Sequence, residues 1–438
     1  MARFFKPQKK KSLDTKHKVL SVTRLDHQGD GVAFDGKKPV FVAGALPGEE
    51  ILAQLTEDKR QFARAKLIKV VKPSAERVQP FCAHYRECGG CNLQHLSHEA
   101  QVIAKQEILG QLMRKFASTE LTQDAPVVSA PLGYRRRARL STKVAKDGKF
   151  EMGFRQRNSN DIVTVNACPV LDASLNDLLP ELYSQLDGLR GRRVIGHIEL
   201  VTSGEGRVLL VRAIKPLHVD DVESLTLFAQ QHAVVLYLQQ GEEEARRLVG
   251  AQPFYALDDL SLKFEPQDFI QVNADINAKM IEQALTWLNV QSDDNVLDLF
   301  CGLGNFSLPL AQQVNAVVGI EGVENMVERA ASNAERNALS NARFYHANLE
   351  LDAAETDWGA QKYNKILLDP ARAGALGVMS YVAQSQAERI VYVSCNPATL
   401  ARDSQVLLDN GYILARLGML DMFPHTGHLE SMALFVKA

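Results

Sequence analysis

The stretch NVLDLFCGLGNFSLPLA (295–311) decides the fold of the second half of the chain. Its apolar run predicts a buried strand, its two glycines predict a tight turn, and the residues that follow begin a helix. Further apolar runs occur at AVVGIE, ARFYHAN, KILLDP and RIVYVSC, with helical segments between them, and GYILARLGML and SMALFVKA close the chain. This alternation predicts a mainly parallel sheet with helices on both faces.

The polar residues that end these strands predict a ligand site at one edge of the sheet. Gly302 and Gly304 let the backbone approach a ligand, and Glu321 ends the next strand about 20 residues later, where an acid can contact a ribose diol. No third glycine completes a dinucleotide-binding motif, which favours a class I (Rossmann-like) S-adenosylmethionine site. Three further residues are expected at this cofactor: Phe300 along it, and Asn348 and Asp369 near its adenine and methionine ends.

A cysteine stands at the same edge, in VYVSCNPATLARD (391–403). Cys395 comes where an apolar strand stops, whereas a structural cysteine is usually a small core residue. The segment FPHTGHLES (423–431) lies between the last two strands, so Glu430 can face Cys395 if the last strand is antiparallel. The alternative that His425, His428 and Glu430 bind a metal is permitted by their spacing, although transfer from a sulfonium needs no Lewis acid.

Together, a thiol and a carboxylate beside a methyl donor suit the methylation of uracil. The C5 carbon of uracil is too weak a nucleophile to take a methyl group directly. Addition of a thiolate at C6 makes an enolate whose C5 can attack the sulfonium methyl, and a base must then remove the C5 proton. Cys395 would supply the covalent catalysis and Glu430 the proton abstraction.

Four other cysteines form a second candidate site. Cys82, Cys88 and Cys91 have the spacing C-x5-C-x2-C, and Cys168 follows much later in the chain. Four thiolates complete either a tetrahedral zinc site or a [4Fe–4S] cluster, and the spacing alone favours neither.

The N-terminal part predicts a small β-barrel with a basic surface. Residues 18–72 read as short alternating strands with glycine turns, and residues 1–72 carry a net charge of +8 in a chain of net charge −2. Cations on the barrel and in the later run YRRRARL (134–140) are candidate phosphate contacts. The barrel candidates are Lys59, Arg60, Arg64, Lys66 and Lys69.

The predicted architecture is a multidomain α/β protein. An OB-like barrel spans residues 10–72, a central α+β domain spans 73–96 and 126–268, and the methyltransferase domain spans 97–125 and 269–438. Within the last of these, residues 97–116 have the apolar spacing of a helix, and Ser97 is its expected N-cap.

The bulk properties set the protein's expected surroundings. No apolar run approaches the roughly 20 residues that span a bilayer, and the charged N-terminus has no apolar segment of the secretory kind behind it. Six cysteines among 438 residues do not make a disulfide scaffold. We expect a cytoplasmic protein, with no membrane partner, that acts as a monomer.

Four motifs resemble the RNA 5-methyluridine methyltransferase family: SCNPATLARD, HTGHLES, DLFCGLGNFSLPLA and LLDPARAG. The resemblance covers nearly the whole chain. It implies that Cys395 is the nucleophile and Glu430 the base, that the four-cysteine group holds a [4Fe–4S] cluster, and that the barrel is a TRAM domain, which binds RNA. The residues it places at S-adenosylmethionine are Gln271, Phe300, Asn305, Glu321, Asn348 and Asp369.

The same resemblance implies a substrate. Relatives with both a barrel and a cysteine cluster methylate 23S ribosomal RNA, which implies the uridine numbered 1939 in a single-stranded or flipped-out state. Two alternatives remain open. The chain could methylate another ribosomal or transfer RNA uridine, or it could be an RNA-binding ribosome-assembly factor with a vestigial cofactor site.

Overall fold

The computed structural model describes residues 16–116, 121–349, 353 and 356–438. The chain forms two compact units. Unit 1 contains residues up to Pro80 together with Asn92–Ala104 and His425–His428, and unit 2 contains Phe81–Cys91, Lys105–Pro424 and Leu429–Ala438. Residues 10–15 of the predicted barrel domain lie outside the described residues.

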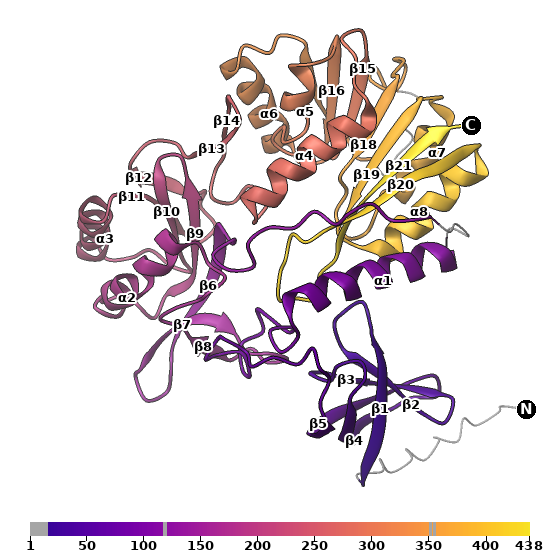
Figure 1. Cartoon of the computed structure of the whole chain (residues 1–438). Helices are drawn as coiled ribbons and strands as arrows, with labels where there is room; N and C mark the ends of the chain where they lie inside the picture. The colour runs from indigo at the N-terminus through magenta and orange to yellow at the C-terminus, as the bar shows by residue number, and fades with distance from the viewer. Residues whose placement is uncertain (1–15, 117–120, 350–352, 354–355) are drawn as a thin grey trace, which may run out of the picture. The chain divides into compact units, whose positions relative to one another are not determined.

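Unit 1 is built on a closed five-stranded barrel (Figure 1). Its strands are β1 (His17–Leu25), β2 (Gly31–Asp35), β3 (Lys38–Val42), β4 (Glu50–Asp58) and β5 (Ala63–Lys72), in the order β1-β2-β3-β5-β4. Alternate residues of β5 explain its sequence, because Ala63 and Ala65 are buried while Arg64 and Lys66 are exposed. The barrel therefore keeps its small apolar side chains inside and its cations in solvent.

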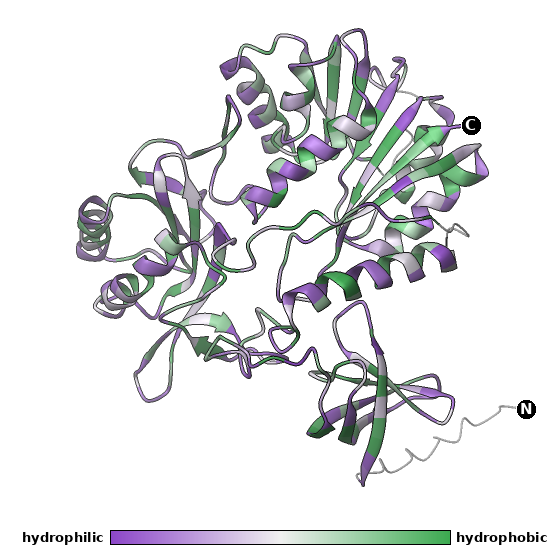
Figure 2. Ribbon diagram, viewed as in Figure 1, coloured by the Kyte–Doolittle hydropathy of each residue, from purple (hydrophilic) through white to green (hydrophobic). Residues whose placement is uncertain are grey.

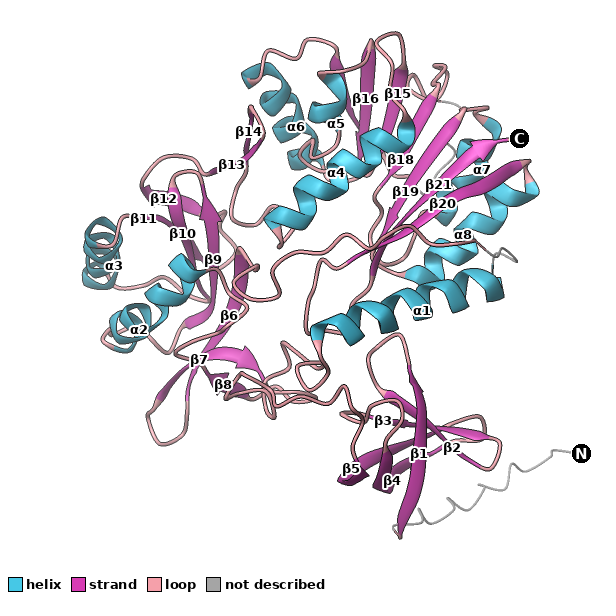
Figure 3. Ribbon diagram, viewed as in Figure 1, coloured by secondary structure: helices cyan, strands magenta, loops and turns pink. Residues whose placement is uncertain are grey.

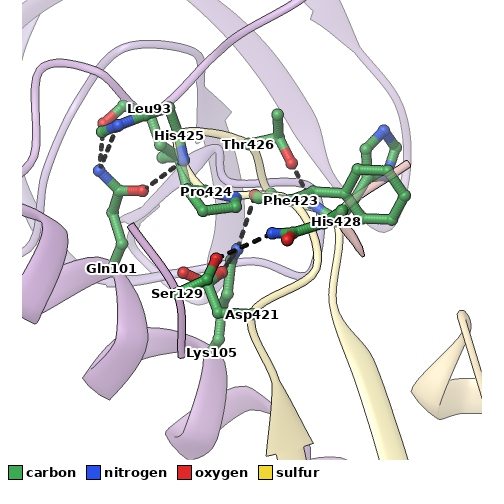
Figure 4. Close-up of polar contacts among 12 residues, drawn as sticks. Leu93, Gln101, Lys105, Ser129, Asp421, Phe423, Pro424, His425, Thr426 and His428 are labelled. Carbon is green, nitrogen blue, oxygen red and sulfur yellow. Dashed lines mark hydrogen bonds and ion pairs between the residues drawn. The ribbon is translucent and has the colours of Figure 1, made fainter. Parts of the chain in front are cut away.

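The helix α1 (His98–Phe116) begins in unit 1 as the sequence predicts. The hydroxyl of Ser97 accepts a hydrogen bond from the amide of Ala100 at 3.4 Å, so Ser97 is the N-cap. One turn into the helix, the side-chain oxygen of Gln101 accepts from the amide of His425 at 2.8 Å (Figure 4). This bond ties the late segment His425–His428 to the start of α1 within unit 1.

Unit 2 contains two seven-stranded sheets. The first has the order β12-β11-β10-β9-β6-β7-β8 and is packed against α2 and α3. Its elements are β6 (Arg137–Val144), β7 (Phe150–Arg155), β8 (Ile162–Thr164), α2 (Ala173–Asp187), β9 (Ile195–Ser203), β10 (Gly206–Ala213), α3 (Val219–Gln231), β11 (Val234–Gln240) and β12 (Arg246–Val249). A short hairpin of β13 (Phe254–Leu257) and β14 (Leu260–Lys263) follows.

The second sheet has the order β17-β16-β15-β18-β19-β21-β20 (Figure 3). Its strands are β15 (Asn295–Leu299), β16 (Ala316–Glu321), β17 (Ala342–His346), β18 (Lys365–Leu368), β19 (Arg389–Ser394), β20 (Tyr412–Leu420) and β21 (Glu430–Lys437). Its helices are α4 (Ala274–Leu288), α5 (Ser307–Ala311), α6 (Glu324–Arg336), α7 (Leu376–Gln384) and α8 (Pro397–Asp409). The first five strands are parallel, and β21 is antiparallel to both of its neighbours, β19 and β20.

Helices cover both faces of this sheet, as predicted. Val391 and Val393 of β19 belong to the hydrophobic cluster that includes buried residues of α4. Ile390 and Tyr392 alternate with them and face the other way, where the Tyr392 hydroxyl donates to Asp403 of α8 at 2.8 Å. The strands are mostly apolar, with hydrophilic residues near several of their ends, whereas the helices carry hydrophilic outer faces (Figure 2). A strand buried on both faces needs this near-continuous apolar sequence.

Candidate active site

The glycine turn after β15 is shaped by three residues with left-handed backbone. Phe300 has φ 65°, Gly302 has φ 56° and Gly304 has φ 98°. A Cβ added to Gly304 would lie 2.1 Å from Cδ1 of Leu308, so this position has no room for a side chain. These conformations delay the helix, which is why α5 is regular only from Ser307.

Glu321 lies directly beside this turn. One of its carboxylate oxygens accepts from the amide of Gly302 at 3.1 Å, and the other accepts from the amide of Val323 at 3.0 Å. The two bonds fix the carboxylate at the end of β16. Each oxygen retains a lone pair for a further donor, such as a ribose hydroxyl.

Asn305 is engaged with the protein itself. Its side-chain amide forms a reciprocal pair with that of Asn277 in α4, with distances of 2.9 and 3.0 Å, and its oxygen also accepts from the hydroxyl of Tyr255 at 2.9 Å. The side chain therefore anchors the glycine turn to α4 and β13. Its predicted contact with the cofactor stays a prediction, and it would involve the backbone of Asn305 more readily than this amide.

Asp298 is an acid at this site that the sequence analysis missed. It is fully buried in β15, one oxygen accepts from the Ser307 hydroxyl, and the other has no hydrogen-bond partner among the described residues. Burial raises the pKa of Asp298 to about 7, against the effect of the Ser307 bond. The available signal was a charged residue inside an otherwise apolar strand.

The next strands bring the remaining predicted cofactor residues to the same edge. Asn348 lies two residues beyond the end of β17, and Asp369 directly follows β18. The side chain of Gln271 donates to Asp369 at 3.5 Å. Burial raises the pKa of Asp369 to about 7. Gln271, Asp369 and the glycine turn thus belong to one region of unit 2.

Cys395 and Glu430 are brought together by the register of β19 and β21. Ser394 pairs with Ser431 at the end of this antiparallel ladder. Cys395 is the next residue after Ser394, and Glu430 is the residue before Ser431, so the two extend the ladder by one step. The predicted antiparallel last strand is confirmed, and its start lies at the carboxyl end of β19 as expected.

Burial, and then the charges around the thiol, favour the neutral form of Cys395. Burial, together with the nearby carboxylates of Glu430 and Asp369, raises the pKa of Cys395 to about 12, and Arg372 opposes this shift. Burial and Asp369 raise the pKa of Glu430 to about 8, against the cations of Arg372 and Lys105. At neutral pH the thiol is therefore protonated, and its ionisation has to accompany attack on a substrate.

The loop after Asp369 is held by the residues that follow Cys395. The side chain of Asn396 donates to the carbonyl of Arg372 at 3.0 Å, and the carboxylate of Asp403 accepts from the amide of Ala375 at 2.7 Å. This explains why a polar sequence follows the thiol: Asn396 caps α8 and Asp403 lies within it, and both fix the loop that carries Arg372.

The cationic run before β6 differs from its prediction. Arg136 is buried and donates to the backbone carbonyl of Gln271 at 2.7 Å. Arg137 forms an ion pair of 2.7 Å with Glu199. Arg136 is wrong as a predicted phosphate contact because its side chain is buried, whereas the predicted contacts of Arg137, which is partly buried, and of Arg139, which is exposed, stay predictions. Arg136 instead holds the backbone at a residue predicted to contact the cofactor.

The four cysteines of the second candidate site are all partly buried. Burial raises the pKa of Cys88 and of Cys168, and the thiol of Cys82 adds to both shifts, so these three side chains lie near one another. The amide of Gly90 donates to the sulfur of Cys88 at 3.4 Å. Amide donors of this kind stabilise a thiolate that binds iron or zinc, and the donor set suits such a metal.

The described part of the chain shows neither a metal-binding arrangement nor a membrane-spanning helix. In residues 16–116, 121–349, 353 and 356–438, no group of three or more His, Cys, Asp or Glu side chains is arranged so that it could hold a metal ion. Within the same ranges, no helix has both the length and the apolar composition needed to cross a membrane.

Comparison with solved structures defines the class of the fold. The *Pyrococcus abyssi* tRNA (uracil-54, C5)-methyltransferase, solved with S-adenosyl-L-homocysteine, matches with a TM-score of 0.74 and 23% identity over 96% of this chain and 100% of that chain. The fold is thus that of an S-adenosylmethionine-dependent methyltransferase. A model of the TRAM domain matches residues 18–68, which identifies the barrel.

Sequence comparison then defines the family. The model described as tRNA (Uracil-5-)-methyltransferase matches residues 97–438. Proteins named 23S rRNA (uracil(1939)-C(5))-methyltransferase RlmD are 55% identical to this chain in *Photobacterium profundum*, over 100% of this chain and 97% of the relative, and 55% identical in *Vibrio cholerae*, over the full length of both. The chain belongs to the uracil-C5 RNA methyltransferase family.

Proposed function

We propose that the protein transfers a methyl group from S-adenosylmethionine to C5 of the 23S ribosomal RNA uridine numbered 1939. The full-length relatives named for this activity support the choice of substrate. The observation that carries the reaction is the register that puts Cys395 and Glu430 side by side at the ligand edge of the sheet. A ribosomal RNA substrate places the enzyme in the cytoplasm.

The side chains have separate roles in this reaction. The thiol of Cys395 loses its proton to solvent as its sulfur attacks C6 of the uracil, and the electrons of the C5–C6 double bond move to form an enolate. S-adenosylmethionine, when bound, supplies an electrophilic methyl group to C5. The carboxylate of Glu430 then takes the C5 proton, the double bond forms again, and the thiolate leaves. Methyl replaces one proton, which ends on Glu430.

The cofactor would be held by residues from four strand ends and by Gln271 from the segment before α4. Glu321 has the geometry for the ribose hydroxyls, and Asp369 with Gln271 lies toward the reacting groups. Phe300, Asn305 and Asn348 complete the set as predictions.

Mapping of the product tests the proposed substrate. Unmodified 23S ribosomal RNA incubated with the protein and S-adenosylmethionine is expected to gain 5-methyluridine at position 1939, detected by mass spectrometry of nuclease fragments. Transfer RNA serves as the competing substrate. Methylation of transfer RNA at the higher rate would contradict the ribosomal assignment while leaving the chemistry intact.

We also infer that Cys82, Cys88, Cys91 and Cys168 hold a [4Fe–4S] cluster. Three observations support this inference: all four thiols are partly buried, the Cys82 thiol raises the pKa of Cys88 and of Cys168, and the Gly90 amide donates to the sulfur of Cys88. The first three residues lie in a loop tied to the region of β7, because Cys88 forms a β-bridge with Gln156. A cluster with four cysteine ligands has no open iron, so its role would be structural or RNA-orienting.

A Cys88→Ser protein is expected to lose iron and, with it, RNA affinity or folding, because a ligand that stays protonated at neutral pH cannot replace a thiolate. Iron content, the visible absorption of the cluster, thermal unfolding and RNA binding measure the effect. Cys301→Ala is the matched control, since Cys301 lies outside the group and should leave the iron in place. Normal RNA affinity and full activity in an iron-free Cys88→Ser protein would refute the role.

We also propose the three domains predicted from the sequence. They are the barrel (10–72), the central domain (73–96 and 126–268) and the methyltransferase domain (97–125 and 269–438). The separate closed barrel and the two separate sheets support it. Exposed cations on β5, such as Lys66 and Lys69, supply the barrel's proposed contacts with RNA phosphates.

A further inference from the structure

A buried ion pair lies next to the proposed base in unit 2. The ammonium of Lys105 in α1 donates to the carboxylate of Asp421 at 2.7 Å and to the backbone carbonyl of Phe423 at 3.0 Å (Figure 4). The side chains of Lys105 and Asp421 are 3% and 0% exposed. A fully buried lysine is costly to keep charged and is rare without a specific partner.

The position of Asp421 connects this pair to Glu430. Leu420 pairs with Glu430 across β20 and β21, and Asp421 is the next residue after Leu420. The amide of Asp421 also donates to the carbonyl of Val127 at 2.9 Å. Asp421 is therefore held through its side chain by Lys105 and through its amide by Val127. It directly follows Leu420, the residue that pairs with Glu430.

The ion pair also holds the start of the loop that leads to Glu430. Lys105 binds Asp421 through its side chain and Phe423 through its backbone, and the hydroxyl of Tyr134 donates to the carbonyl of Pro424 at 3.2 Å. Anchors at Asp421, Phe423 and Pro424 leave this part of the loop little freedom. Lys105 thus fastens the start of this loop to α1.

We propose that Lys105 is a positioning residue for proton abstraction, which fixes the chain before Glu430 and keeps a positive charge beside the Glu430 carboxylate. This inference rests on the proposed function. Under this inference, a residue of α1 favours the ionised form of the Glu430 side chain, although α1 does not belong to the strand ends that carry the other site residues.

The sign of the expected effect follows from the groups that face Glu430. Asp369 raises the pKa of Glu430, as does burial, while Arg372 and Lys105 lower it. Cys395 faces it from the end of β19, and Asp421 stands at the end of β20. Removal of the Lys105 charge would therefore raise the pKa of Glu430 further, and less carboxylate would be present at a given pH.

The test uses the full-length protein, S-adenosylmethionine and an RNA with tritium at uracil C5. Release of tritium reports proton abstraction. In Lys105→Met the pH at which release becomes half-maximal is expected to rise by about one unit, with a loss of about tenfold at pH 7 and recovery at high pH. Formation of the covalent adduct with 5-fluorouracil RNA should change little, since that step precedes proton abstraction.

Two further variants keep the result interpretable. Lys105→Met with Asp421→Asn removes the charge without leaving a buried carboxylate unpaired, and it should show the same upward shift if the single variant folds poorly. Lys365→Met is the matched control: Lys365 is another buried lysine in unit 2, paired with Glu388 at 2.9 Å, but it starts β18 at the end opposite to Asp369. Its pH profile should stay that of the wild type.

The outcomes separate this inference from the proposed function. An equal loss at every pH, or an equal loss of adduct and of tritium release, would mean that Lys105 has only a structural role and would overturn the inference. Wild-type protein that releases no tritium from bound RNA would overturn the proposed function and the inference with it.

Discussion

The Cys395→Ala protein is expected to lose methyl transfer by roughly 10⁴-fold or more, because the sulfur that is proposed to add to C6 of uracil has been removed. The sulfur extends the β19–β21 ladder beside Glu430, and removal of one sulfur atom changes little of the packing at this partly buried position. With 5-fluorouracil RNA and labelled cofactor, wild-type protein should form a covalent complex that survives denaturation, and Cys395→Ala should form none.

The control for this variant is Cys301→Ala. Cys301 is only 3% exposed in the glycine turn, so a uracil ring cannot reach its sulfur, whereas Cys395 is only partly buried. The covalent complex should persist in Cys301→Ala. If the complex persists in Cys395→Ala as well, while RNA binding is normal in both, the nucleophile is another residue and the proposed mechanism is wrong.

The sequence was sufficient to place Cys395 and Glu430 because strand ends are marked by local signals. The apolar run before Cys395 stops at an Asn-Pro pair, and the apolar run after Glu430 begins at Ser431, so both residues stand at boundaries that hydrophobic patterning reveals. Local signals do not give the order of the strands in the sheet. In the structure, β21 pairs antiparallel with β19, and this pairing brings Glu430 next to Cys395. The same reasoning placed Glu321 and Asp369 at strand ends.

Residues whose role depends on a distant partner could not be found in this way. Lys105 and Asp421 are 316 residues apart, and in the sequence Lys105 is one of several charged residues in an amphipathic helix. Arg136 and Arg137 appeared to be surface cations because a cluster of charges usually lies in solvent. Their partners, a backbone carbonyl and Glu199, come from other elements of unit 2, and local patterning carries no information about such contacts.

The metal group marks another limit of the sequence. Spacing identifies a set of four cysteines but not the ion, because zinc and a [4Fe–4S] cluster both accept four thiolates. The Cys82 thiol raises the pKa of Cys88 and of Cys168. Among the described residues, however, no group of side chains has the arrangement of a metal site. The identity of the group therefore depends on the iron analysis of the Cys88→Ser protein.

The Glu430→Gln protein is expected to stop after methyl transfer, with Cys395 still bound to C6. Glutamine has nearly the shape of glutamate but cannot take the C5 proton, so the double bond cannot form again and the thiolate cannot leave. Turnover should fall by about 10²–10⁴-fold. Unlike the wild type, this variant should accumulate a covalent complex with ordinary uracil RNA, visible as a labelled band on a denaturing gel.

The pH dependence gives this prediction a second measurement. Because burial raises the pKa of Glu430 to about 8, the wild-type rate of C5-proton release should rise with pH up to about that value, since only the ionised carboxylate accepts a proton. Glu430→Gln should lose this rise. Glu388→Gln is the matched control, because Glu388 lies just before β19, at the end opposite to Cys395, and pairs with Lys365 there. A Glu430→Gln protein that turns over normally, or that forms no complex with bound uracil RNA, would show that proton abstraction is the work of a different group, and Asp369 would be the next residue to test.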